Sequence, residues 1–287
     1  MSISTIVDDL RIAARSMFRR PALTGASVLT LGIGLSGVAL VFSSLWAVVG
    51  GRLVVADEDR LVRIYQMRAN STARISLRPA IFDEIGRRQA SFEPMVAQRF
   101  ADLAVDHGGT LERVVGVGVT NGWTATLGIA PTLGRPFAPD EFDLGDGFPV
   151  VIASYAFWRD RLGSSAATIG EPLLVDGRER LLVGVMPRGF DFPYNASLWF
   201  PMTVEPSELR ARSLNVVARV KPGLAIETVN ADLSRIGAAL ALEQPDAYRA
   251  STLVAEPLRD TLVGDSRRPL GAVLAAAAVL VSIVGAN

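Results

Sequence analysis

The chain has no cysteine, and histidine and lysine each occur once, as His107 and Lys221. Without cysteine there is no disulfide, no thiolate metal site and no thiol nucleophile. A single histidine cannot supply the convergent ligands of a zinc site, so we expect a solvated turn residue in His107-Gly108-Gly109. Lys221 lies in VKPGL and not in a G-x-x-x-x-G-K-[ST] phosphate loop. We therefore predict no catalytic, cofactor-binding or metal site, and we assign any ATP hydrolysis to a separate chain.

Positive and negative charges are equally frequent, with 29 Lys and Arg against 29 Asp and Glu. This balance gives no global attraction to polyanions, so we predict no nucleic-acid partner. Hydrophobic residues make up 49% of the chain and the mean hydropathy is +0.32, which favours membrane attachment. The adjacent acids at 57–59 and 140–141 are expected on solvated loops, where they lack the separate environments of a catalytic acid and base.

Ionisable residues are absent from two stretches of the chain. Residues 21–51 have none, and they exceed the roughly 20 apolar residues that a helix needs to cross a bilayer. The alternative is a cleaved signal peptide, whose apolar core would be about 7–15 residues long and would end in an A-x-A-like site. We predict a first transmembrane helix at 21–51. The charge-free residues 269–287 predict a second transmembrane helix.

The first predicted span contains a glycine motif. GIGLSG, at 32–37, satisfies the G-x-G-x-x-G dinucleotide fingerprint, but that fingerprint requires a preceding strand and a loop that exposes its backbone to a pyrophosphate. These glycines lie inside an uninterrupted apolar run. Gly32 and Ser36 are four residues apart, so we predict instead that they form a small-residue face against which a second helix packs.

Residues 1–20 show the pattern of an amphipathic helix. Apolar residues recur every three or four positions, and Arg11, Arg15 and Arg19 occupy the other positions, with Arg20 following. We predict a helix in the membrane interface whose arginines contact anionic head groups of the lipid bilayer; a helix packed on a partner protein is the alternative. By the positive-inside tendency the N-terminus is cytoplasmic, and residues 52–268 are therefore extracytoplasmic.

The residues between the spans are those of an α+β domain. Strands are expected at 60–67, 92–106, 111–120, 212–220 and 251–258. Helices are expected at 78–88 and, after a turn at Pro222-Gly223, at 224–243. This succession is a split βαβ order, so we predict one half of the domain in two parts, 52–120 and 206–268. Between them, residues 121–205 form an inserted α+β subdomain with a hairpin around Asp176-Gly177 and a rigid aromatic and proline-rich stretch, 187–202, at a domain edge.

Several sequence segments together resemble the MacB-like and FtsX-like permeases of ABC transporters. They run in order over nearly all the chain: DLRIAARSMFRRPALTGASVLTLGIG, LGIAPTLGRPFAPDE, VVIASYAFWRDRLG, LLVDGRERLLVGVMPRGFDFP, LWFPM, VVARVKPGLAIETVNADL and GAVLAAAAVLVSIVGAN. They look closest to the duplicated permeases called orphan because no ATPase is encoded with them. The resemblance implies a subunit of the bacterial inner membrane with a periplasmic domain that consists of a porter part and an inserted part. Such permeases continue through further membrane helices, so the resemblance also implies that residues 269–287 are the start of a truncated second transmembrane helix and that the sequence is the N-terminal part of a longer protein.

The same resemblance implies a function. Such permeases transmit ATPase-driven motion through their membrane helices to the periplasmic domain, for export or efflux. The expected partners are an ABC ATPase subunit, a second copy in a homodimer, and a periplasmic or outer-membrane protein. Two other functions fit the layout of two spans around one domain: a membrane-anchored sensor or protein-interaction module, and an anchored enzyme.

Overall fold

The computed structural model describes residues 54–68, 73–143, 149–205, 214–243, 248 and 251–262, together with residues 32, 36 and 37. The chain divides into two units, Leu53–Thr261 and a second made of Met1–Arg52 and Leu262–Asn287. All the helices and strands whose bounds are defined lie in the first unit. That unit is the domain described below.

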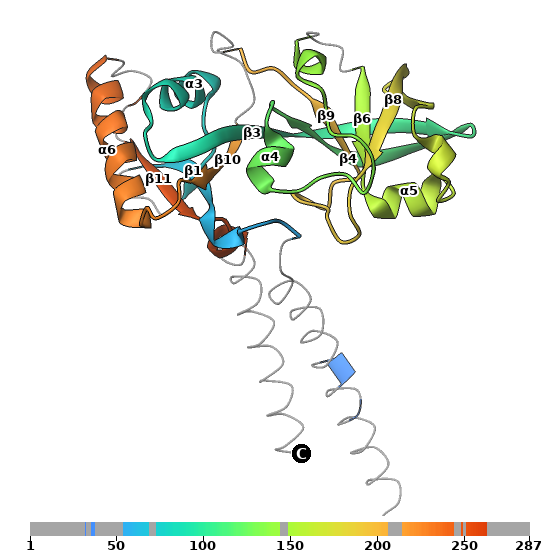
Figure 1. Cartoon of the computed structure of the whole chain (residues 1–287), viewed down its shortest axis with the longest axis horizontal. Helices are drawn as coiled ribbons and strands as arrows, with labels where there is room; N and C mark the ends of the chain where they lie inside the picture. Colours follow the sequence, from blue (N-terminus) through green and yellow to red (C-terminus); the bar gives the residue numbers. More distant parts are fainter. Residues whose placement is uncertain are drawn as a thin grey trace, which may run out of the picture. The chain divides into compact units, whose positions relative to one another are not determined.

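One lobe of the domain, the porter lobe, is an antiparallel sheet with two helices (Figure 1). The sheet order is β11-β1-β10-β3, so each βαβ unit has a strand of the other unit between its own two strands. This is the split βαβ arrangement. The elements of this lobe are η1 (Glu58–Arg60), β1 (Leu61–Arg68), β2 (Arg74–Ile75), α3 (Pro79–Arg88), the first half of β3 (Phe92–His107), β10 (Asn215–Val220), α6 (Ile226–Glu243) and β11 (Ser251–Pro257). The short strand β2 pairs with β1.

The core of the porter lobe lies between the sheet and both helices, because side chains alternate along each strand. On β10, Val216, Ala218 and Val220 face this core, whereas Asn215, Val217 and Arg219 face the opposite side. Both helices contribute apolar residues at helical spacing to the same cluster, which shows that they cover one face of the sheet. These residues are Ile81, Ile85, Val229, Leu233, Ile236 and Leu240.

The second lobe, the barrel lobe, is a closed ring of six strands. The ring runs β3-β4-β9-β6-β8-β7 and returns to β3, where Val105 and Asp106 pair with Val175 and Leu174. Closure removes the free edges that an open sheet would present. The lobe contains the second half of β3, β4 (Thr110–Val119), α4 (Trp123–Leu127), β5 (Leu133–Gly134), η2 (Pro139–Phe142), β6 (Val150–Ala153), α5 (Tyr155–Arg161), η3 (Ala166–Thr168), β7 (Pro172–Val175), β8 (Arg178–Val185) and β9 (Leu198–Pro201).

The interior of the ring is filled by side chains. Leu103, Val114, Val175 and Leu182 are buried there, and Phe157 of α5 packs on them. Helix α5 begins after Ser154, whose hydroxyl oxygen accepts a hydrogen bond from the Phe157 amide at 3.1 Å. This bond satisfies one of the backbone N–H groups that have no partner within the first turn of a helix. A six-stranded ring is small enough to be packed solid, so the barrel is a core and not a channel.

Helix α4 connects the two lobes. It begins after Gly122 and ends at Gly128, both of which have positive φ angles (82° and 64°) that glycine tolerates. It packs against β3 and β10 of the porter sheet, on the side opposite α3 and α6. Its Trp123 ring packs on Trp199 of β9, with centroids 5.7 Å apart. Helix α4 therefore contacts the outside of the barrel and the free face of the porter sheet.

The structure places several expected elements and changes others. The predicted turns at His107-Gly108-Gly109 and Asp176-Gly177 are two-residue hairpin loops, with His107 opposite Thr110 and Val175 opposite Arg178. The stretch at 187–202 is not only an edge feature, because β9 lies between β4 and β6 in the ring. The boundary expected at residue 120 falls just after β4, but β4 and the outer half of β3 complete the barrel with the inserted strands.

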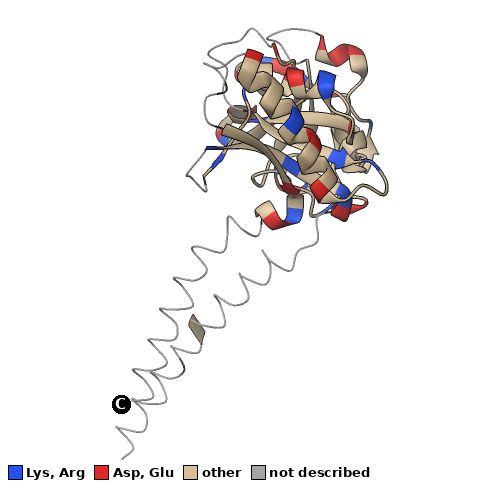
Figure 2. Ribbon diagram, turned by 90° about the vertical axis from the view of Figure 1, so that its left-hand side faces the viewer, with Lys and Arg blue, Asp and Glu red and all other residues tan. Residues whose placement is uncertain are grey.

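Charges of both signs are interspersed over the domain (Figure 2). The expectation of solvated loops at 57–59 and 140–141 is wrong for two of these acids, because the side chains of Glu58 and Glu141 are only 14% and 12% exposed. Glu141 accepts hydrogen bonds from both Nη atoms of Arg135 and, at 2.7 Å, from the Ala138 amide. Glu141 thus holds together the turn that follows β5.

Replacing Glu141 by glutamine is expected to lower the free energy of unfolding by about 1–2 kcal/mol near neutral pH, because charge-assisted hydrogen bonds are lost. The Arg135 guanidinium lowers the pKa of the Glu141 carboxyl. A carboxyl whose pKa is lower in the folded state than in the unfolded state contributes to the free energy of unfolding. This stabilisation is complete above the unfolded-state pKa and is lost as the pH falls through the folded-state pKa. The melting temperatures of wild type and Glu141→Gln should therefore converge in strong acid. A gap of equal size at neutral and acid pH would contradict this assignment.

Candidate functional site at the start of the domain

The site is formed by the segment through which the chain enters the domain from the predicted first span. Residues 54–57, here called the incoming segment, lead directly into η1 and β1. The Ala56 amide donates to the carbonyl of Leu127, the last residue of α4, at 3.3 Å. Asp57 has a positive φ of 47°, which turns the chain into η1. The incoming segment is therefore in contact with the helix that connects the two lobes.

Arg219 of β10 holds this contact. Its side chain is 7% exposed, and its guanidinium donates from Nε to Thr126 O (2.9 Å), from Nη2 to Ala56 O (2.7 Å) and from Nη1 to Asp57 O (3.4 Å). Burial lowers the pKa of Arg219, with the charge of Arg60 nearby acting in the same direction. An arginine stays protonated at such a site, so one fixed charge binds carbonyls of the incoming segment and of α4.

A second arginine fixes the end of the incoming segment to the porter lobe. Arg60 donates from Nε and Nη2 to Val220 O, at 2.9 and 2.8 Å, and contacts Glu93 Oε1 at 2.5 Å. Its Nη1 lies 3.7 Å from Asp57 Oδ2. These contacts tie η1 to the end of β10 and the start of β3.

The segment that leaves the domain is next to the segment that enters it. Residues 258–262 are helical, with Leu258 and Thr261 buried. Arg259 Nε lies 4.0 Å from Glu58 Oε1 of η1. Figure 1 shows the blue start and the red end of the domain side by side at this position. The domain is thus attached to the rest of the chain through two neighbouring segments.

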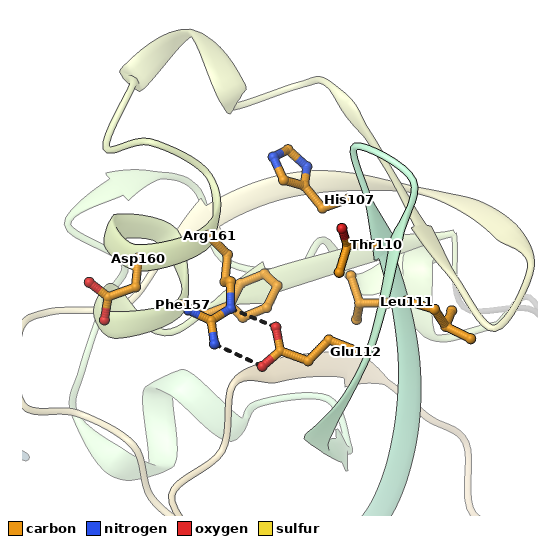
Figure 3. A pocket seen from close by; sticks show the side chains of 8 residues that line it. His107, Thr110, Leu111, Glu112, Phe157, Asp160 and Arg161 are labelled. Atoms are coloured by element: carbon orange, nitrogen blue, oxygen red, sulfur yellow. Dashed lines mark hydrogen bonds and ion pairs between the residues drawn. The ribbon is translucent and has the colours of Figure 1, made fainter.

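A pocket in the barrel lobe is a second candidate. It has a volume of about 480 Å³ and lies between the β3–β4 hairpin and α5, where Figure 3 shows its lining. Arg161 Nε and Nη2 bind the two carboxylate oxygens of Glu112 at 2.6 and 2.9 Å, and this lowers the pKa of Glu112. Asp160 is paired with Arg159 at 2.6 Å. The other lining residues are Val105, His107, Thr110, Leu111 and Phe157.

The site residues expected from the sequence have different outcomes. Gly32 and Ser36 are helical and exposed, and their role in helix packing stays a prediction. Arg11, Arg15, Arg19 and Arg20 lie outside the described residues. His107 is exposed in its turn and lines the pocket. In the part of the chain that the structure describes, no three His, Cys, Asp or Glu side chains are grouped as metal ligands would be.

Sequence reasoning did not single out Arg219. An arginine in a strand normally marks the solvent face, and in NVVARV Arg219 shares its face with one polar residue, Asn215, and one apolar residue, Val217. A mixed face of this kind does not by itself indicate a strand that is covered on both sides. The only sequence signal for a buried Arg219 was therefore Val217.

Comparison with known proteins assigns the family. The profile of the MacB-like periplasmic core domain matches residues 24–236. Because this match covers most of the chain, the chain belongs to that family, and the predicted resemblance to MacB-like ABC transporter permeases is confirmed for this domain. The family is one of periplasmic domains of inner-membrane transporters, so the domain is extracytoplasmic. No curated protein matches the chain significantly.

Solved structures agree in fold. The periplasmic region of MacB from Actinobacillus actinomycetemcomitans is 11% identical, with a TM-score of 0.53, over 74% of this chain and 94% of that one. The extracellular domain of the ABC-type transporter YknZ from Gram-positive bacteria is 13% identical, with a TM-score of 0.50, over 68% and 99% of the two chains. At these identities the likeness establishes the mixed α/β fold.

The described residues contain no helix that is both long enough and apolar enough to cross a membrane. The predicted spans at 21–51 and 269–287 fall outside those residues, apart from Gly32, Ser36 and Gly37. Both spans stay predictions.

Proposed function

We propose that the chain is the membrane subunit of a MacB/FtsX-type ABC transporter, or the N-terminal part of that subunit, and that it passes ATPase-driven motion to its periplasmic domain for export or efflux. The observation that carries this proposal is the attachment of the domain. The incoming segment is bound by Arg219 and Arg60, and it lies beside the outgoing residues 258–262 through Glu58 and Arg259. A displacement of either flanking segment therefore acts directly on folded structure.

The sequence supports the membrane half of the proposal. Charge-free stretches at 21–51 and 269–287 flank the domain on both sides. The first is long enough to be a membrane span, and the second is the predicted start of one. The predicted spans connect to the domain through two neighbouring segments, the incoming segment and residues 258–262. Relative movement of the two spans would then change the position of η1 against residues 258–262.

The proposed partners follow from the same assignment. ATP is hydrolysed by a separate ABC ATPase subunit, the permease acts as a homodimer in the bilayer, and the barrel lobe meets a periplasmic or outer-membrane protein. The N-terminal arginines Arg11, Arg15, Arg19 and Arg20 would lie at the cytoplasmic surface. The chain itself performs no bond chemistry.

A reporter of topology tests this function. Alkaline phosphatase inserted at Gly163, in an exposed turn of the barrel lobe, should be active, and a green fluorescent protein inserted there should be dark. The same two reporters fused before residue 2 should give the reverse result. Fluorescence from the insertion at Gly163 would contradict the proposal. A transporter subunit should also stimulate ATP hydrolysis by its ABC ATPase on reconstitution in nanodiscs, and no stimulation would contradict coupling.

A membrane-anchored sensor is the second candidate, favoured by the pocket between the β3–β4 hairpin and α5. Its volume of about 480 Å³ lies within the range of small-molecule sites, about 300–1,000 Å³. If the domain is a sensor, binding of a small ligand should raise its melting temperature. This increase should be absent in Arg161→Met, which removes the ion pair with Glu112. A transporter subunit with no ligand should show neither effect.

A further inference from the structure

We propose that Arg219 is the positioning residue that makes the barrel lobe follow the incoming segment. This inference rests on the proposed function and specifies how motion reaches the second lobe. The guanidinium of Arg219 joins three parts of the domain: β10 of the porter lobe, which carries it, residues 56–57 of the incoming segment, and Thr126 at the end of α4. Movement of residues 56–57 is thereby imposed on α4.

Helix α4 then carries the movement to the barrel. Trp123 packs on Trp199 of β9 and on Phe190, with ring centroids 5.7 Å from each, and both Trp123 and Trp199 are buried. Close-packed aromatic rings of this kind cannot slide past one another without opening a cavity. The chain of contacts from residue 56 to the barrel is therefore Arg219, α4, Trp123 and Trp199.

The strand opposite this residue is irregular. The pairing of β10 with β3 shifts register between Ala218 and Val220, where two residues of β3, Glu93 and Pro94, lie opposite the single residue Arg219. The extra residue of this bulge is therefore on β3. Arg219 itself keeps regular pairing with Leu61 of β1, so its side chain points to the face opposite Ala218 and Val220, where it reaches the incoming segment and α4.

The remaining connections between the lobes allow a pivot. Strand β3 pairs with β10 up to Gln98 and with β4 from Gln98 onward, so it is continuous through both lobes. At the other end of β10, Asn215 donates to the Tyr194 hydroxyl of the 187–197 loop, and it accepts from Arg63 at 2.9 Å. Loss of the Arg219 contacts leaves these two connections intact, together with the hydrogen bond from the Ala56 amide to Leu127 O and the packing of α4 on β3 and β10. The barrel lobe would then stay folded and attached, but it would be less restrained against rotation about β3.

Spin-label distances in the full chain, in nanodiscs, test this proposal. The chain has no cysteine, so Leu242→Cys on α6 and Leu111→Cys on β4, at positions 86% and 72% exposed, can be labelled without background. With labelled chains diluted in unlabelled chains, so that a homodimer carries one labelled copy, we expect one narrow distance distribution between the lobes of the parent chain. Arg219→Met keeps an unbranched apolar stem but removes all the donors of the side chain, and should broaden the distribution. Arg159→Met removes only a surface pair with its neighbour Asp160 and should leave it narrow.

Hydrogen exchange separates positioning from general stability. In Arg219→Met the amides of residues 54–60 and 122–129 should exchange at least about tenfold faster, because bonds from a charged donor are lost, while α6 keeps its protection. Arg219→Lys has a single ammonium that cannot reach three carbonyls, and should show the same broadened distances. A narrow distribution in Arg219→Met, or faster exchange throughout the domain including α6, overturns the proposal. Neither measurement involves ATP, so this result is independent of the topology and ATPase tests.

Discussion

Replacing Trp199 by alanine is expected to lower the free energy of unfolding by about 3–5 kcal/mol, the range for a fully buried large aromatic side chain. Trp199 is 0% exposed in β9. Its ring packs on Trp123 and Phe190, with centroids 5.7 and 5.4 Å away, and its Nε1–H donates to Phe192 O at 3.1 Å. The substitution removes this packing, leaves a cavity and orphans a buried carbonyl.

The position of Trp199 makes the loss large. It is paired on one side with Val117 of β4 and on the other with Ile152 of β6, inside the ring order of the barrel. Helix α4 and the loop before β9 cover it from outside, so nothing in the neighbourhood is free to collapse into the space. Sites that cannot relax show the largest costs in such substitutions.

Urea unfolding of the full chain in detergent, followed by circular dichroism, measures this effect. Two further variants calibrate it. Trp199→Phe keeps an aromatic ring and should lose less than the alanine variant. Phe100→Ala removes an aromatic ring that is 45% exposed and should cost less than about 1.5 kcal/mol. A Trp199→Ala loss no greater than that of Phe100→Ala would contradict the role of the aromatic cluster.

Local signals in the sequence were sufficient for the porter lobe. Its helices follow 3.6-residue spacing, and its strands are bounded by turn residues, so elements such as α3, α6 and β11 could be placed from their own residues. The Asp176-Gly177 hairpin is also local, because a two-residue turn and its flanking strands fix their own register. Nothing distant along the chain is needed for these features.

The barrel could not be predicted in the same way. Strand β9 has four residues, LWFP, and pairs in parallel with β4, about 80 positions earlier. Its residues are apolar on both faces because one side meets the barrel core and the other meets α4, so there is no alternation to find. The closure of β7 on β3 involves only Val105 and Asp106 on the β3 side. Such contacts are decided by tertiary packing.

The candidate site depends on the same long-range packing. Arg219 is separated from Ala56 by 163 positions and from Thr126 by 93. Its partners are backbone carbonyls, and every residue has one, so no side-chain motif marks them. The acidic run at 57–59 is conspicuous in the sequence because of its carboxylates. The hydrogen bonds of Arg219, however, go to the backbone carbonyl groups of residues 56 and 57.

Replacing Gly128 by alanine is expected to destabilise the domain by about 2–4 kcal/mol, from two separate causes. Gly128 ends α4 with a φ of +64°, where an L side chain costs about 1 kcal/mol or more. An added Cβ would also lie 2.7 Å from Ala56 Cβ and 3.1 Å from Arg219 Nη2. This overlap must push the incoming segment away from α4, and overpacking of this kind costs about 1–3 kcal/mol.

Gly163→Ala is the matched control for the cost of placing a side chain at a positive φ angle. Gly163 has a similar φ of +73°, but an added Cβ there would meet nothing within 4 Å. The difference between the two variants in urea unfolding is therefore the cost of displacing the incoming segment. If this displacement releases the Arg219 contacts, Gly128→Ala and Arg219→Met break the same interaction, and their double variant should lose less than the sum of the single losses. Equal losses in Gly128→Ala and Gly163→Ala, or full additivity of the pair, would mean that residue 56 is not held between α4 and Arg219.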